Sequence, residues 1–149
     1  MKTSTTILCG LLVLSIGCGG PLVMIPGGKL SGTVQPAPSD WAFSDEFEDV
    51  QLETRPSNPY SVNIWGVADR DRFYIASGRG LESTWAKHIE ADPNVRLRID
   101  GHLYELRAVR TDDPQDRVRF LAAVKKKYDG FEPDEEQAAV SVLYNLESR

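Results

Sequence analysis

The loop Ser77-Gly78-Arg79-Gly80 is the part of this sequence with the clearest character of a ligand site. An arginine side chain is a permanently charged, forked set of donors that suits a phosphate or carboxylate group. The first turn of a helix that follows adds free backbone N–H groups, which also favour an anion. The loop therefore suggests anion binding, although an arginine between two glycines is equally typical of a solvated surface loop.

The rest of the sequence offers few other groups for catalysis. It contains no G-x-S-x-G motif, no phosphate-binding P-loop and no cysteine after residue 18. His88 and His102 are far apart and have no partners at metal-ligand spacing, so we expect no metal site. The formal charge of -5, from 22 acidic and 17 basic residues, argues against a nucleic-acid partner, which would require a basic face.

The N-terminal segment has the features of an export signal. After Lys2 the chain carries no charge until Lys29, and residues 7–16 form the apolar run ILCGLLVLSI. Residues 15–18, Ser-Ile-Gly-Cys, resemble a bacterial lipobox in which serine stands in place of the usual leucine. The resemblance implies that residues 1–17 are a lipoprotein signal peptide and that Cys18 is lipidated. An uncleaved N-terminal membrane anchor is the alternative.

Both interpretations place the rest of the chain in the cell envelope, attached to a membrane and facing outside the cytoplasm. Gly19 after Cys18 resembles the pattern sent to the outer membrane, if the host has one. Residues 18–40, rich in glycine, proline and serine, predict a membrane-proximal tether, part of which can lie against the domain. Residues 41–149 then form one domain, without a disulfide.

The apolar pattern of residues 41–149 predicts about six strands and two helices. Asp100-Gly101 is a typical two-residue hairpin turn, and Asp113-Pro114 is a typical helix start. The predicted strands are residues 50–55, 61–68, 72–77, 95–99, 102–110 and 138–146, and the predicted helices are 85–91 and 114 to about 128.

The predicted connections are mostly too short for parallel crossovers. The expected fold class is therefore mainly β with packed helices (α+β), built on an antiparallel barrel-like sheet. In the second helix we expect an apolar stripe to face the sheet, made by Val118, Leu121, Ala122, Val124 and Tyr128.

The order of these motifs resembles the FMN-binding split-barrel superfamily. The resemblance is carried by IWGV (64–67), FYI (73–75), SGRG (77–80), Trp85 and DPNVRLRIDG (92–101). The superfamily includes pyridoxamine phosphate oxidase-like proteins and deazaflavin-dependent nitroreductases. The closer similarity is to an uncharacterised bacterial branch with a late lysine–tyrosine pair, here Lys127-Tyr128. The resemblance covers roughly residues 50–146 and implies a six-stranded antiparallel split barrel with two helices.

The resemblance also implies an FMN site at the end of the third strand and the start of the first helix. The positions that would hold the cofactor phosphate are Ser77, Arg79, Ser83, Thr84, Lys87 and His88. Trp85 would border the cofactor ring or the substrate, and Tyr128 would lie near the substrate pocket. From helical spacing alone, Trp85 has the alternative of packing in the core with Ile89, four residues later. Because many split barrels dimerise, a homodimer is expected as well.

Two functions follow from these observations. The first is a membrane-anchored lipoprotein whose split barrel binds a small ligand or a partner protein without a cofactor. The alternative is a flavin- or deazaflavin-binding oxidoreductase. Export as an unfolded chain favours the first, because flavins are scarce outside the cytoplasm. Residues 54–58, TRPSN, also match the superfamily's phosphate-contacting T-R-x-S-G strand only in part.

Overall fold

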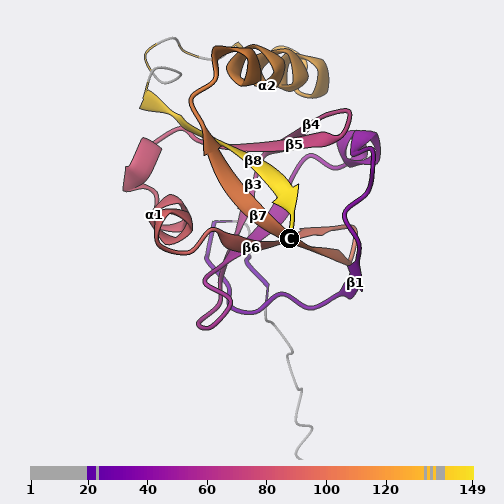
Figure 1. Ribbon diagram of the computed structural model, residues 1–149, viewed down its shortest axis with the longest axis vertical. Coiled ribbons are helices and arrows are strands. Elements are labelled where there is room, and N and C mark those ends of the chain that lie inside the picture. Colours follow the sequence, from indigo (N-terminus) through magenta and orange to yellow (C-terminus); the bar gives the residue numbers. More distant parts are fainter. Residues whose placement is uncertain (1–19, 23, 133, 135, 137–139) are drawn as a thin grey trace, which may run out of the picture.

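One curved antiparallel sheet organises the computed structural model, which describes residues 20–22, 24–132, 134, 136 and 140–149 (Figure 1). Within these residues the strands are β1 (Thr33–Gln35), β2 (Val50–Thr54), β3 (Tyr60–Ile64), β4 (Gly66–Asp69), β5 (Arg72–Ser77), β6 (Asn94–Ile99), β7 (His102–Thr111) and β8 (Val142–Ser148). The order in the sheet is β3-β2-β6-β7-β8-β5-β4, and β1 pairs in parallel with β7. The predicted fold class is confirmed, with eight strands in the described ranges rather than six.

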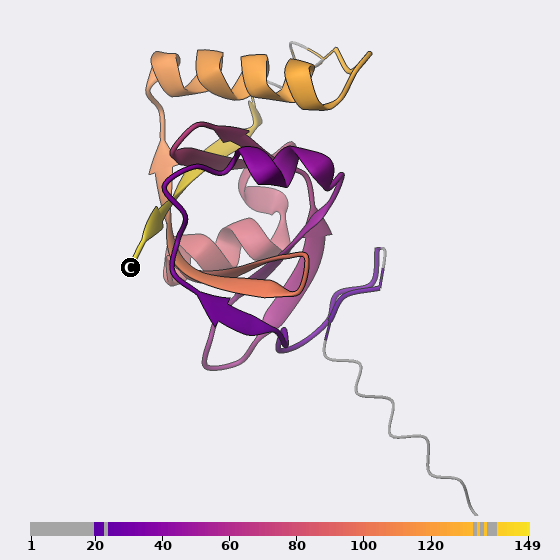
Figure 2. The same ribbon diagram turned by 90° about the vertical axis from the view of Figure 1, so that its right-hand side faces the viewer.

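Two α-helices and two 3-10 turns whose residues are all described accompany the sheet. They are η1 (Ala42–Glu46), η2 (Gly80–Glu82), α1 (Thr84–Ala91) and α2 (Pro114–Lys127). Asp113 caps α2 as its side chain accepts a hydrogen bond from the backbone of Gln115 at 2.8 Å. Figures 1 and 2 both show α2 lying across one end of the sheet, well separated from α1.

The largest correction to the predicted elements concerns residues 61–68. We expected one strand, but the chain forms β3, which pairs with β2, and then β4, which pairs with β5. These two strands end the sheet order on opposite sides and are joined through Trp65 alone. A Cβ atom on Gly66 would lie 2.6 Å from the ring of Phe73, so glycine allows the close approach of β4 to β5.

Part of the expected tether is packed on the domain. Leu30 is 1% exposed, and its backbone N–H donates to Glu53 at 2.6 Å while its carbonyl accepts from Arg96 at 2.9 Å. Arg96 and Glu53 also form a two-bonded ion pair, at 2.8 and 2.5 Å. Residues 33–35 add β1 to the sheet. The segment around Leu30 therefore contributes to the fold instead of only linking it to a membrane.

Several predicted features lie outside the described residues. They are the signal peptide of residues 1–17, the lipidation site Cys18 and the start of the predicted closing strand, which in the structure begins as β8 at Val142. None of the helices in the described ranges combines the length and the apolar character needed to cross a bilayer.

Asp116, in the first turn of α2, ties this helix to the sheet. It is 6% exposed and accepts hydrogen bonds from Arg72 at 2.6 Å, Tyr74 at 2.8 Å and Thr111 at 2.8 Å. Burial by itself raises the pKa of Asp116. The hydrogen bonds from Thr111 and Tyr74, with the charges of Arg72 and Arg119, outweigh burial and hold the pKa below its usual value.

The Asp116 contacts also set the rotation of α2 about its axis. The expected apolar stripe is wrong at Val118, which is 61% exposed, and at Ala122, which is also exposed. The stripe is right at Val124, which is buried, and it missed Ala123, which is buried beside it. A carboxylate that finds three donors on β5 and β7 thus overrides the preference of one valine for burial.

Replacing Asp116 with alanine removes the acceptor shared by three side chains. We expect the free energy of unfolding at pH 7 to fall by about 3 kcal/mol, because a hydrogen bond to a charged group contributes about 1.5–3 kcal/mol. Urea denaturation measures this loss. Asp112→Ala is the matched control, because the Asp112 side chain is 85% exposed just before the start of α2.

The stabilisation by Asp116 should depend on pH. Its pKa is lower in the folded chain, so its contribution is complete above the unfolded pKa of about 4 and is lost as the pH falls through the folded value. The stability difference between the wild type and Asp116→Asn should therefore narrow on acidification. A difference that stays constant from pH 7 to pH 3 would contradict this role of the carboxylate.

Candidate functional site

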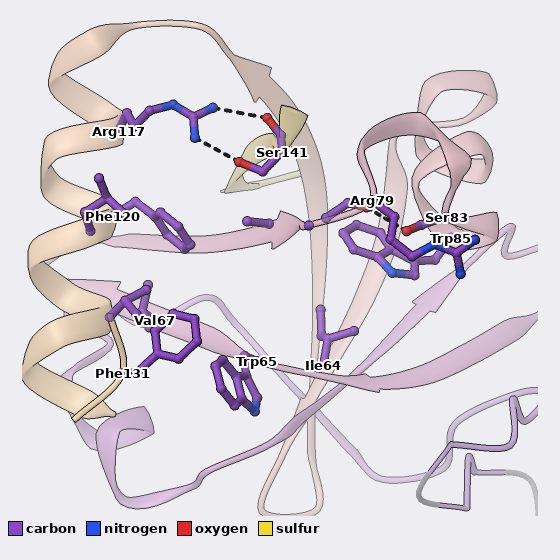
Figure 3. Close-up of a pocket in the computed structure, with 15 residues that line it drawn as sticks. Ile64, Trp65, Val67, Arg79, Ser83, Trp85, Arg117, Phe120, Phe131 and Ser141 are labelled. Atoms are coloured by element: carbon purple, nitrogen blue, oxygen red, sulfur yellow. Dashed lines mark hydrogen bonds between the residues drawn. The ribbon is translucent and has the colours of Figure 1, made fainter. Parts of the chain in front are cut away.

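An open cavity of about 520 Å³ lies where α2, the β3–β4 junction and the SGRG loop meet (Figure 3). This volume is within the range of small-molecule sites, and most of the lining is apolar. The lining residues are Ile64, Trp65, Val67, Ala76, Ser77, Gly78, Arg79, Ser83, Trp85, Arg117, Phe120, Leu121, Val124, Phe131 and Ser141. Four of the predicted site residues, Ser77, Arg79, Ser83 and Trp85, are among them.

Arg79 stands at the exposed edge of the cavity. Within the described part of the chain its guanidinium group has no hydrogen-bond or ion-pair partner, whereas its carbonyl accepts from the backbone of Glu82 at 3.1 Å. Gly80 positions the loop, since its φ of +55° suits glycine and a Cβ there would lie 2.7 Å from the carbonyl oxygen of Val140. Arg79 is thus a charged donor group available to a ligand.

The two predicted serine ligands are committed to the loop itself. The Ser77 hydroxyl donates to the carbonyl of Gly80 at 2.7 Å and lies 2.7 Å from the hydroxyl of Ser83. A carbonyl can only accept, so the single proton of Ser77 goes to Gly80 and the proton between the two hydroxyls belongs to Ser83. Neither serine has a proton left for a phosphate group. They shape the loop instead.

Arg117 borders the cavity opposite Arg79. Figure 3 shows Arg117 and Phe120 projecting from α2 on one side, with Arg79 and Trp85 on the other. The Arg117 guanidinium donates to the hydroxyl of Ser141 at 2.9 Å and to its carbonyl at 3.2 Å. These bonds hold the Arg117 guanidinium along the wall of the cavity. The cavity therefore has a guanidinium at each end, with apolar side chains between the two.

Trp85 combines the two roles considered for it. It is 9% exposed, its ring centroid is 6.0 Å from that of Tyr144, and Ile89 is buried on the same helix. It also lines the cavity. Its ring is therefore a core side chain with one part facing the cavity.

Three other predicted phosphate ligands do not line the cavity. Thr84 and Lys87 are exposed on α1. His88 faces away, with Nδ1 3.0 Å from the Thr54 hydroxyl and its ring edge-on to Tyr60. Burial, with the charge of Arg55, lowers the pKa of His88. Among the described residues no group of three or more histidine, cysteine or carboxylate side chains is arranged to hold a metal.

Tyr128 lies behind Trp65 rather than in the cavity. The two rings stack with centroids 4.4 Å apart, and the Tyr128 hydroxyl donates to the carbonyl of Glu48 at 2.7 Å. Burial raises the pKa of Tyr128. The neighbouring Lys127 donates to the carbonyl of Gly66 at 2.7 Å, and burial lowers its pKa. The pair thus supports Trp65 and the β3–β4 junction from outside the cavity.

The sequence analysis missed the residues that α2 and its following loop bring to the cavity, namely Arg117, Phe120, Leu121, Phe131 and Ser141. The predicted helical stripe included Leu121 and Val124, which line the cavity, but it wrongly placed Val118 and Ala122 inside. Asp116 was no clear signal of the rotation of α2, because a carboxylate in the first turn of a helix is already favoured by the helix dipole without partners on other elements.

The curved sheet and the helices packed on it have the split-barrel fold. A family model described as "Uncharacterized protein conserved in bacteria (DUF2255)" matches residues 43–142, and the chain belongs to this family. No curated protein matches the sequence.

Solved structures share the fold at low sequence identity. A provisionally assigned pyridoxamine 5'-phosphate oxidase from Listeria innocua has a TM-score of 0.53 and 16% identity over 70% of this chain and 86% of that one. A FAD-binding protein from Mesorhizobium loti has a TM-score of 0.50 and 17% identity over 68% and 81%. A structure described as a domain-swapped dimer has a TM-score of 0.54 and 13% identity over 68% and 81%. These similarities concern the fold.

The different roles of Ser77 and Arg79 can be tested by stability. Ser77→Ala should lower the free energy of unfolding by about 1–3 kcal/mol, because it leaves the buried Gly80 carbonyl without its donor. Arg79→Ala should change it by no more than about 0.5 kcal/mol, as is usual for an exposed side chain. Thermal or urea denaturation measures both. A loss at Arg79 as large as that at Ser77 would show that the arginine holds the loop together.

Proposed function

We propose that this protein binds a planar ligand that carries an anionic group, of the flavin type, in the cavity between α1 and α2. The observation that carries the proposal is the guanidinium of Arg79, which has no partner within the described residues and stands at the edge of an apolar cavity. An arginine in this position recognises phosphate or carboxylate by paired, charge-assisted hydrogen bonds.

The lining fits the ring system of a flavin better than its phosphate. Ile64, Val67 and Phe120 supply an apolar surface, and Trp65 and Trp85 supply aromatic edges. For the phosphate, Arg79 is the only charged side-chain donor among the predicted positions that line the cavity. The backbone start of α1, which no side chain caps, is the second source of donors.

A bound flavin would supply hydride-transfer chemistry, and the protein would act as an oxidoreductase. The role of this chain would then be to bind the phosphate through Arg79, to orient the ring between the aromatic side chains and to exclude water with the apolar wall. The FAD-binding protein that shares the fold supports this proposal.

Binding without a cofactor is the second candidate function. It is favoured by the two serines, whose protons are already used within the loop, and by Thr84 and Lys87, which do not line the cavity. In this case the same cavity would bind another small ligand that has an apolar body and an anionic group. Arg79 would bind the anionic group, and the apolar wall would contact the body of the ligand.

We further propose that the protein is attached to a membrane of the cell envelope through a lipid on Cys18 and that it forms a homodimer. The lipobox-like residues 15–18 support the attachment. The domain-swapped dimer among the solved structures with this fold supports self-association.

Titration of the detergent-purified protein with FMN tests the ligand. We expect quenching of FMN fluorescence and a rise in the melting temperature, because a ligand that binds the folded state stabilises it. Arg79→Ala should raise the Kd for FMN about tenfold, which corresponds to about 1.4 kcal/mol. It should leave binding of riboflavin, which has no phosphate, unchanged.

Lys87→Ala is the matched control, because it removes a nearby exposed charge that does not line the cavity. Wild-type protein that neither quenches FMN nor melts at a higher temperature with it would favour binding without a cofactor. Sedimentation of the same samples measures the homodimer, and a monomer would contradict that part of the proposal.

Substitution of Cys18 tests the membrane attachment. Cys18→Ser should abolish acylation, seen as the loss of the acyl mass by mass spectrometry, whereas Cys9→Ser should retain it. A Cys18→Ser protein that keeps its leader and its full membrane association would instead establish the uncleaved anchor. The wild-type protein in the soluble fraction would contradict both forms of attachment.

A further inference from the structure

Three large apolar side chains near the start of the described chain face solvent. Leu22 is 59% exposed, Met24 92% and Ile25 66%. Leu22 and Ile25 are joined by two backbone hydrogen bonds, from Leu22 N to Ile25 O at 3.0 Å and from Ile25 N to Leu22 O at 2.6 Å. We name these three residues the apolar hairpin. Other exposed large apolar side chains in the described ranges stand singly along the sequence.

The base of the apolar hairpin is held on the domain. Gly27 and Ser61, the latter in β3, exchange two backbone hydrogen bonds at 2.8 and 2.9 Å. A Cβ atom on Gly27 would lie 2.6 Å from the carbonyl oxygen of Gly20, so the two glycines close the base against each other. Figure 2 shows this segment, in indigo, standing out from the body of the molecule instead of folding back on the sheet.

The composition of the segment suits burial in lipid. No charged residue occurs between Lys2 and Lys29, so insertion would not desolvate a charge. Pro21 and Pro26 flank the apolar hairpin and have no N–H group that needs a partner. The backbone groups of Leu22 and Ile25 that pair with each other would keep their hydrogen bonds in an apolar medium.

The position of the apolar hairpin, close to the leader in the sequence, favours lipid as the surface that covers it. Leu22 follows Cys18 by four residues, which span at most about 14 Å when fully extended. The apolar run of residues 7–16 precedes Cys18, so either a lipidated Cys18 or an uncleaved anchor brings the bilayer next to the apolar hairpin. Interfacial protein segments bury their apolar side chains about 5–10 Å into the headgroup and acyl boundary.

We propose that the apolar hairpin inserts into the membrane to which the leader attaches the chain, so that the domain is seated on the bilayer in a fixed orientation. This inference rests on the membrane attachment proposed above. The hairpin is the second contact with the membrane and is rooted on β3, so it converts a flexible attachment into an oriented one.

A site-specific fluorescence experiment on the full-length protein in phospholipid vesicles tests this insertion. Residues 20–149 contain no cysteine, so Met24→Cys can carry the environment-sensitive fluorophore NBD. Lys29→Cys is the matched control because it is exposed and lies in the same N-terminal segment, beyond the pairing of Gly27 with β3, and Val118→Cys on α2 is a distant control. Background labelling at Cys9 and Cys18 is measured on the wild-type protein.

We expect spin labels on the lipid acyl chains to quench NBD at position 24 about threefold more than at position 29, because only position 24 would reach the interfacial depth of about 5–10 Å. Position 118 should not be quenched. Equal quenching at positions 24 and 29 in vesicle-bound protein would overturn the insertion and leave the attachment intact.

Two further outcomes would also overturn the proposal. Blue-shifted NBD emission at position 24 without quenching by lipid spin labels would show that protein, such as a second copy of the chain, covers the apolar hairpin. Full-length protein that does not float with the vesicles would overturn the membrane attachment itself and this inference with it.

Discussion

The passage of the chain through Trp65 is the constraint on which the rest of the fold depends. Trp65 alone connects β3 and β4, which end the sheet order on opposite sides, so the sheet must curve until its two ends meet. Gly66 permits the meeting, because a side chain there would collide with the ring of Phe73. Lys127 and Tyr128 then support the junction from the end of α2, through the carbonyl of Gly66 and the ring of Trp65.

The cavity is a consequence of that closure and of the rotation of α2. The β3–β4 junction supplies one wall, the loop after β5 supplies another, and α2 covers the space between them. Asp116 selects which face of α2 is turned inward by its bonds to β5 and β7. An apolar space bordered by Arg79 and Arg117 results, in which the Ser77 and Ser83 hydroxyls are bonded within the loop and Arg117 is bonded to Ser141.

The N-terminal segment joins the domain to its surroundings. Leu30 is held by the Glu53–Arg96 ion pair in the sheet, whereas the apolar hairpin a few residues earlier faces solvent. A segment that is anchored at one end and exposed and apolar at the other differs from a free linker, in which neither end is ordered. Together with the membrane attachment proposed above, such an arrangement would give the domain a second contact with the bilayer.

The sequence by itself determined the local elements and the fold class. Hairpin turns such as Asp100-Gly101, the Asp113 cap and strand alternation depend on neighbouring residues, so β5, β6, β7 and both helices were predicted within a few positions. It also indicated the loop at Arg79 as a candidate ligand site, and this loop lines the cavity. Tertiary structure alone decided which donors remain free, how α2 is rotated and where residues 61–68 divide, because these depend on groups such as Gly80, Asp116 and Phe73 that meet their partners only in the folded sheet.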